Sequence, residues 1–232
     1  MCKHPDSKQN SAFTLIEVIT AMLIIVILTG LVLGIAGYAN RLAALKRATG
    51  EVAMLQAACD NYKAETGGYP QDYKEEKYTG STEKLSPKQH FDPTNKVYSD
   101  AGKFLYQELT GDKDTDGAPD KDEPVYLKEY DTKILKADRG GTNNRITRVY
   151  YFQDPFGYPY GYSTAGLRGE QEFQKELRHN TKDAKRPTGA DLKGFNTGSY
   201  DIWSTGGSKK TVAVSASDAE KDKEWAKWIK NW

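Results

Sequence analysis

Apolar residues dominate one long stretch near the start of the chain, and a periodic pattern follows it. Residues 18–39 contain no charged side chain, and about 20 apolar residues suffice to cross the hydrocarbon core of a bilayer. Further on, apolar positions recur at spacings of three and four residues, at Leu45, Ala48, Val52, Leu55, Cys59 and Tyr62. Such spacing predicts an amphipathic helix with one buried face. We therefore predict one helix over residues 14–66, with a transmembrane part at residues 13–39 and an amphipathic continuation at residues 40–66.

The sequence GGYP at residues 67–70 ends this helix, because glycine favours the C-terminal cap and proline cannot continue a helix. Residues 67–232 are long enough for one globular domain. Within them, runs rich in Tyr, Val and Ile predict strands at residues 125–128, 146–152, 158–163 and 200–204. Helices are predicted at residues 100–109, 170–179 and 218–230, and loops at residues 131–145 and 181–199. The predicted class is α+β: a long N-terminal spine helix packed on a small antiparallel sheet domain.

Composition narrows the range of functions. The net charge of +1 gives no reason to expect a nucleic-acid partner. The three histidines lack metal-ligand spacing, and no nucleophile elbow, P-loop or Cys/His pair is present, so we predict that the chain is not an enzyme. The cysteines, Cys2 and Cys59, give no disulfide framework. Cys59 is predicted to be a small buried residue on the helix.

One acid interrupts the apolar N-terminal region. A charge at the centre of a membrane helix costs about 2.5–3.5 kcal/mol, so Glu17 requires compensation. It lies in the first turn of the predicted helix, where the helix dipole favours an anion. It also lies four residues after Phe13, on the same helical face.

Residues 12–18, AFTLIEV, resemble the cleavage and methylation motif of type IV prepilins and of type II secretion pseudopilins. The resemblance implies that residues 1–12 are a leader, that a prepilin peptidase cuts between Ala12 and Phe13, and that the new amine of Phe13 is methylated. It also implies that Glu17 of one subunit meets the terminal amine of a neighbour and sets the register of assembly. Ala12 departs from the family, which usually has glycine at this position.

Three further segments resemble the major, G-type pseudopilin of type II secretion systems: TGGYP at residues 66–70, DPFGYPY at residues 154–160 and YDIWSTGG at residues 200–207. The resemblance implies a structural subunit of a periplasmic pseudopilus, a homopolymer formed through the N-terminal helix that drives protein export. Its implied partners are the prepilin peptidase, minor pseudopilins and the inner-membrane assembly platform. The implied location is a single pass of the bacterial inner membrane, with residues 67–232 forming a periplasmic globular domain.

The charge of the leader predicts an orientation in the membrane, and two alternative functions stay open. The basic residues of the leader favour a cytoplasmic N-terminus by the positive-inside rule. Removing the leader takes the 33 basic and 32 acidic residues to 31 of each. Two alternatives stay open: a type IV pilin subunit for adhesion or motility, and a membrane-anchored calcium-binding module that does not polymerise.

Residues 112–123, DKDTDGAPDKDE, fit the calcium-loop pattern D-x-D-x-D-G-x5-E. Alternate carboxylates converge on one hard cation in such a loop, and its glycine permits the sharp turn. The pattern assigns these ligands: Asp112, Asp114, Asp116, the carbonyl of Ala118, Asp120 and Glu123. We expect a lone structural calcium site, because no helix is predicted after Pro124; a solvated acidic turn is the alternative. The resembled family binds calcium near a late loop, where this chain has Lys209 and Lys210, so that site is expected to be absent.

Overall fold

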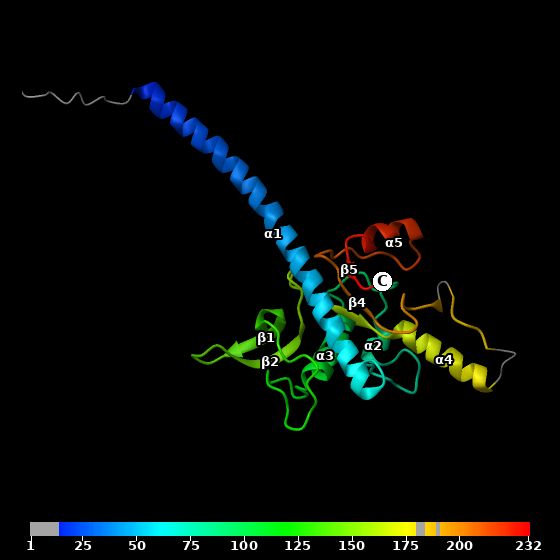
Figure 1. The fold of residues 1–232 in the computed structure, drawn as a ribbon. Coiled ribbons are helices and arrows are strands. Elements are labelled where there is room, and N and C mark those ends of the chain that lie inside the picture. Colours follow the sequence, from blue (N-terminus) through cyan, green and yellow to red (C-terminus); the bar gives the residue numbers. More distant parts are fainter. Residues whose placement is uncertain (1–13, 180–183, 189–190) are drawn as a thin grey trace, which may run out of the picture. The chain divides into compact units, whose positions relative to one another are not determined.

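Helix α1 (Leu15–Thr66) runs through both of the units into which the chain divides, Met1–Ala43 and Ala44–Trp232 (Figure 1). The computed structural model describes residues 14–179, 184–188 and 191–232, except for the side chains of residues 32–34. The described residues form helices and short strands that pair in antiparallel sheets, so the predicted α+β class is confirmed. The predicted single helix over residues 14–66 is also confirmed, to within one residue.

The described part of the first unit consists of the beginning of α1. Its large apolar side chains are exposed on every face of the helix; Leu15, Met22 and Ile25 are examples, at 78%, 63% and 62%. The helix is long and apolar enough to cross a membrane. A helix that is apolar all round belongs in lipid or among other apolar helices.

In the second unit, the continuation of α1 buries one face only. Ala48, Val52, Leu55 and Cys59 are buried, which confirms the predicted stripe. Val52, Leu55 and Cys59 pack in one cluster with residues of α3 (Lys96–Thr110), and with the aromatic and aliphatic residues of the sheets. Cys59 is a free, buried thiol, and this burial raises its pKa. The predicted helix at residues 100–109 is the C-terminal part of α3, which begins four residues earlier.

Two small antiparallel sheets complete the core. In the first, β1 (Leu135–Gly140) pairs with β2 (Arg145–Phe152), from Leu135 opposite Phe152 to Gly140 opposite Arg145. In the second, β4 (Asp201–Ser204) lies between β3 (Gly161–Ser163) and β5 (Ile229–Lys230). The short helix α2 (Ser81–Lys84) and the 3₁₀ turn η1 (Thr132–Ile134) lie in the connections. Helix α4 (Ala165–His179) follows β3 directly.

Two of the predicted segments between residues 125 and 145 are wrong. Residues 125–128 form no strand: the N–H groups of Tyr126 and Leu127 both donate to the carbonyl of Leu109, at 2.9 and 2.8 Å. They thereby satisfy an end carbonyl of α3. Residues 131–145 are not a loop, because they contain η1 and β1. The polar composition of β1 concealed the strand: only Leu135 of its residues is buried, and two register shifts break the alternation.

The C-terminal helix also ends earlier than predicted. Helix α5 (Asp218–Trp225) is followed by a turn and β5, not by further helix up to residue 230. Tertiary packing overrides the helical preference here. The ring of Trp228 stacks on that of Trp203, with 5.7 Å between centroids, and Trp232 stacks on Phe195 at 4.7 Å. Trp203, Trp228 and Trp232 belong to a second hydrophobic cluster, rich in aromatic rings, which includes the C-terminal end of the domain.

Two buried aspartates fix irregular segments to strand β4: Asp201 is its first residue, and Asp154 bonds to its last residue, Ser204. Asp154 accepts hydrogen bonds from the N–H groups of Phe156 and Tyr158, at 3.0 and 2.9 Å, and from the hydroxyl of Ser204, at 2.6 Å. Asp201 accepts from the N–H groups of Phe195 and Asn196, at 2.8 and 2.9 Å. Each carboxylate therefore ties an irregular segment to β4. Burial raises the pKa of each to about 6, against the opposing effect of these hydrogen bonds.

The raised pKa of Asp154 determines how its contribution to the free energy of unfolding changes with pH. The folded state holds the proton of Asp154 up to about pH 6, whereas the unfolded chain releases it near pH 3.9. The contribution to stability is thus present at low pH and lost as the pH rises through about 6. Asp154→Asn should remove roughly 1 kcal/mol of the change in unfolding free energy between about pH 7.5 and about pH 5. Urea titrations of the full chain in detergent, followed by tryptophan fluorescence, measure this change; equal pH dependence in both proteins would contradict the assignment.

Candidate functional site

The first candidate site lies at the beginning of α1. The backbone N–H and the hydroxyl of Thr14 both donate to Oε2 of Glu17, each at 2.8 Å. In return, the N–H of Glu17 donates to the hydroxyl oxygen of Thr14 at 3.3 Å. This reciprocal pair is a capping box, in which a Thr at the N-cap and a Glu three residues later satisfy each other's backbone groups.

The capping box gives the carboxylate two donors within its own chain. The sequence analysis did not single out Thr14, although the pattern T-x-x-E ahead of an apolar run was readable. The predicted cleavage site, between Ala12 and Phe13, lies outside the described residues. Glu17 is exposed, so its second oxygen is open to a further donor.

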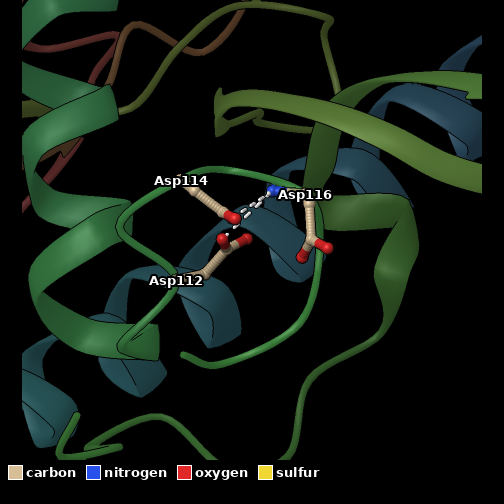
Figure 2. A group of neighbouring side chains, drawn as sticks. All are labelled: Asp112, Asp114 and Asp116. Carbon is tan, nitrogen blue, oxygen red and sulfur yellow. Dashed lines mark hydrogen bonds between the residues drawn. The ribbon is translucent and has the colours of Figure 1, made fainter. Parts of the chain in front are cut away.

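The second candidate site is the acidic loop after α3 (Figure 2). Asp112 follows the left-handed cap residue Gly111 and is buried, at 1% exposure. Its carboxylate accepts hydrogen bonds from the N–H groups of Asp116, at 3.1 Å, and Gly117, at 2.8 Å. It also accepts from the hydroxyl of Tyr106 in α3. Asp112 thus holds the loop closed from its inner side.

Two exposed acids converge on Asp112. Oxygens of Asp112, Asp114 and Asp116 lie within 4.8 Å of one another. The N–H of Asp116 donates to Asp114 at 3.1 Å and lowers its pKa, but desolvation, the bond to Asp112 and the charges of Asp116 and Asp120 together raise it. Three hard oxygen donors in this arrangement suit Ca²⁺, which prefers carboxylate ligands.

The other predicted ligands lie outside this group of three in the described structure. Asp120 accepts a hydrogen bond from the N–H of Lys113 at 2.7 Å, so one of its oxygens is engaged within the loop. The N–H of Ala118 donates to Asp116 at 2.9 Å. Glu123 is exposed. The loop therefore gathers the first three predicted carboxylates, while Ala118, Asp120 and Glu123 lie along its continuation.

The loop packs against the β1–β2 hairpin. The carbonyl of Thr115 accepts the N–H of Val149 in β2 at 2.8 Å. Gly117 has a φ of +95°, and a Cβ built there would meet Cγ2 of Ile146 at 2.7 Å. Glycine is thus required both by the backbone conformation and by the neighbouring side chain.

The late loop that carries Lys209 and Lys210 makes polar contacts of a different kind. Nζ of Lys210 lies 3.4 Å from Glu220, in α5. Ser208 donates to the buried Glu224, which also pairs with Lys227 at 2.7 Å. Lys209 lies over the ring of Tyr158. These contacts link the loop to α5 and to the turn at residues 154–158.

Comparison with known proteins bears on the first site. Residues 7–33 match the family model described as the prokaryotic N-terminal methylation motif. The chain carries a type IV pilin-like prepilin signal. This signal contains the predicted cleavage site, the capping box and the first half of the apolar region, and it supports a structural, pilin-like protein.

The prepilin signal covers a small part of the chain. It implies processing by a prepilin peptidase and polymerisation in general. No curated protein matches the chain, and no solved structure does. The more specific resemblance to G-type pseudopilins therefore stays a prediction.

The two requirements on Gly117 can be separated by substitution. Gly141, in the hairpin turn, also has a positive φ, of +73°, but a Cβ there would meet nothing within 4 Å. Gly141→Ala should lower the unfolding free energy by about 1 kcal/mol, from backbone strain alone. Gly117→Ala should lower it by about 3 kcal/mol, because overpacking against Ile146 adds to the strain. Urea denaturation of both variants measures the difference, and equal losses would show that the contact with Ile146 costs nothing.

Proposed function

We propose that the chain is a structural subunit of a type II secretion pseudopilus, processed by a prepilin peptidase and polymerised through α1. The observation that carries the proposal is a single carboxylate, Glu17, inside a prepilin signal at the start of a helix whose apolar side chains are exposed all round. Such a helix finds apolar surroundings either in lipid or among the helices of other copies.

The capping box supports this role for Glu17. Before assembly, Thr14 supplies hydrogen bonds to the carboxylate but no positive charge. Cleavage ahead of Phe13 creates a cationic amine one helical turn from Glu17 in the same chain, and the same amine in every neighbour. An ion pair is strongest where water is excluded. Pairing of the Glu17 carboxylate with a neighbour's amine would therefore favour transfer of the subunit from lipid into the helical core of a filament.

The choice of a pseudopilus over a type IV pilus rests on the late segments. Two of the stretches that resemble G-type pseudopilins, residues 154–160 and 200–207, meet in the folded domain through the 2.6 Å bond between Asp154 and Ser204. Two segments that resemble the same family are thus in contact in the folded domain. This contact favours a common domain structure over a chance similarity of two short segments. A periplasmic location and minor pseudopilin, peptidase and assembly-platform partners follow from this proposal.

The first experiment separates the charge of Glu17 from its cap. Mass spectrometry of the chain from producing cells should give a mature N-terminus at methylated Phe13. Glu17→Gln keeps a side chain that can complete a capping box but removes the charge. If charge pairing drives assembly, Glu17→Gln and Glu17→Ala should both reduce the sedimentable polymer at least about tenfold, as expected for the loss of a charge pair worth over about 1.4 kcal/mol.

The outcomes distinguish the alternatives. Polymer formation retained in Glu17→Gln but lost in Glu17→Ala would assign Glu17 to helix capping only. An N-terminus at Met1, with no polymer in the unsubstituted protein, would favour a non-polymerising anchor. Polymers that extend from the cell surface without any effect on protein export would favour a type IV pilus.

We further propose that the acidic loop binds a structural calcium ion. Asp112, Asp114 and Asp116 would hold the cation, and the sequence pattern assigns the remaining positions to Ala118, Asp120 and Glu123. The cation would neutralise carboxylates that lie close together; desolvation, the bond to Asp112 and the charges of Asp116 and Asp120 raise the pKa of Asp114. Binding to the folded state alone would also stabilise the loop against Ile146 and Val149.

Calorimetry of the full chain in detergent tests the calcium proposal with a matched pair of variants. Asp114 and Asp122 are both exposed acids of the loop, but only Asp114 is at a ligand position. Asp114→Ala should weaken calcium binding at least about tenfold, since it removes a charged ligand, whereas Asp122→Asn should retain it. The proposal fails if millimolar calcium produces no heat, or if both variants bind like the unsubstituted protein.

A further inference from the structure

The distal half of the β1–β2 hairpin is mostly exposed, although the acidic loop packs against its residue Ile146. We call residues 136–148 the hairpin arm. Its residues Lys136, Asp138, Arg139, Arg145, Thr147 and Arg148 are exposed, as are residues 141–144. The sheet has only two strands, so within the described residues the outer edge of β1 has no strand beside it. A two-stranded hairpin is marginally stable alone, and this one gains support mainly at its base, from the Val149–Thr115 bond.

The arm carries an uncompensated positive charge. It has four cations and one acid, Asp138, whose carboxylate accepts the hydroxyl of Tyr150 at 2.6 Å. Among the described residues, none of these cations lies within ion-pair distance of an acid. The cations are Lys136, Arg139, Arg145 and Arg148. They are therefore available to an external acidic surface.

The acidic loop is a surface of the opposite sign. Residues 112–123 contain six acids and two lysines. Of these lysines, Lys113 pairs with Glu108 of α3 at 2.5 Å, outside the loop. Asp116, Arg139 and Arg145 line one hollow of about 300 Å³, but the acid forms no ion pair with either arginine. Each chain thus has an acidic and a basic surface that adjoin at this hollow, and within the described structure no ion pair joins the two.

We propose that the hairpin arm of one copy docks on the acidic loop of the next copy. The proposal rests on the proposed polymerisation, which brings copies side by side. A second copy is the favoured occupant because the chain itself supplies the complementary charge and its net charge of +1 opposes self-association little. A contact between two different patches is heterologous, so it propagates along a filament instead of closing a pair.

The magnitude of such a contact fits a repeated interface. A single exposed ion pair is weak because water and salt screen it, so it would not hold two isolated domains together. In a filament every added subunit makes the contact again, beside the packing of its apolar helix. The arm would therefore adjust the stability and register of the polymer, not create it.

A charge exchange between the two surfaces tests the proposal in the full-length protein, in cells at constant calcium. Arg139→Glu combined with Arg145→Glu should lower the sedimentable polymer about fivefold, and Asp122→Lys about twofold, from repulsion between like charges. Combining all three substitutions should restore at least half of the polymer, because the signs are again opposite at the contact. Disulfide trapping between cysteines placed at residues 122 and 145 should link different copies in the filament.

Matched controls keep the result interpretable. Lys175 and Arg178 of α4 are exposed cations away from the arm, and reversing both should leave the polymer unchanged. Thermal unfolding checks that each variant folds. Unaltered polymer in the arginine variant, or no recovery in the combined variant, overturns the docking proposal. If the unsubstituted polymer depends on Glu17 but not on the arm, only this inference fails; if no polymer forms at all, the proposed function fails with it.

Discussion

Helix α1 must satisfy two different environments with one continuous backbone. In the first unit its apolar side chains are exposed on every face, whereas in the second unit only the face with Val52, Leu55 and Cys59 is apolar and buried. The apolar pattern of α1 therefore changes from all faces to one face along its length, and the structure of each unit depends on its part of this pattern. At the first turn, where backbone N–H groups lack helical partners, Thr14 and Glu17 satisfy the helix end.

The globular unit compensates for small sheets with buried carboxylates. Asp112, Asp154 and Asp201 are each nearly inaccessible, and each accepts two backbone N–H groups from an irregular segment. Hydrogen bonds to a charged acceptor are about twice as strong as neutral ones. A domain with a two-stranded and a three-stranded sheet can in this way fix long connections without extensive ladders. The abundance of Asp in the sequence is thus partly structural.

Features with a regular sequence pattern were predictable, and features set by tertiary contacts or by irregular strand pairing were not. The helix over residues 14–66 and its buried stripe were predictable because the periodicity continues for many turns. The acidic loop was predictable because its carboxylates alternate around a glycine. Strand β1 was missed, since its residues face water and its bulges break the alternation. The end of α5 was missed because the contact of Trp228 with Trp203 lies far away in sequence.

The candidate sites divide in the same manner. The motif around Glu17 was found through its resemblance to the prepilin motif. The capping role of Thr14 was readable from the sequence, although membrane context drew attention to the glutamate alone. The packing of the acidic loop against Ile146 was not readable, because nothing in residues 112–123 identifies a partner 29 residues beyond Gly117. Side-chain contacts of this kind depend on the folded arrangement of separate segments.

The aromatic cluster at the end of the domain has a consequence for biogenesis. Strand β5 supplies an edge of the second sheet, and Trp232 stacks on Phe195. Trp228 and Trp232 pack in one cluster with Trp203 and with Phe91, which is far from them in the sequence. Until residues 228–232 have been synthesised, Trp203 and Phe91 therefore lack these aromatic partners.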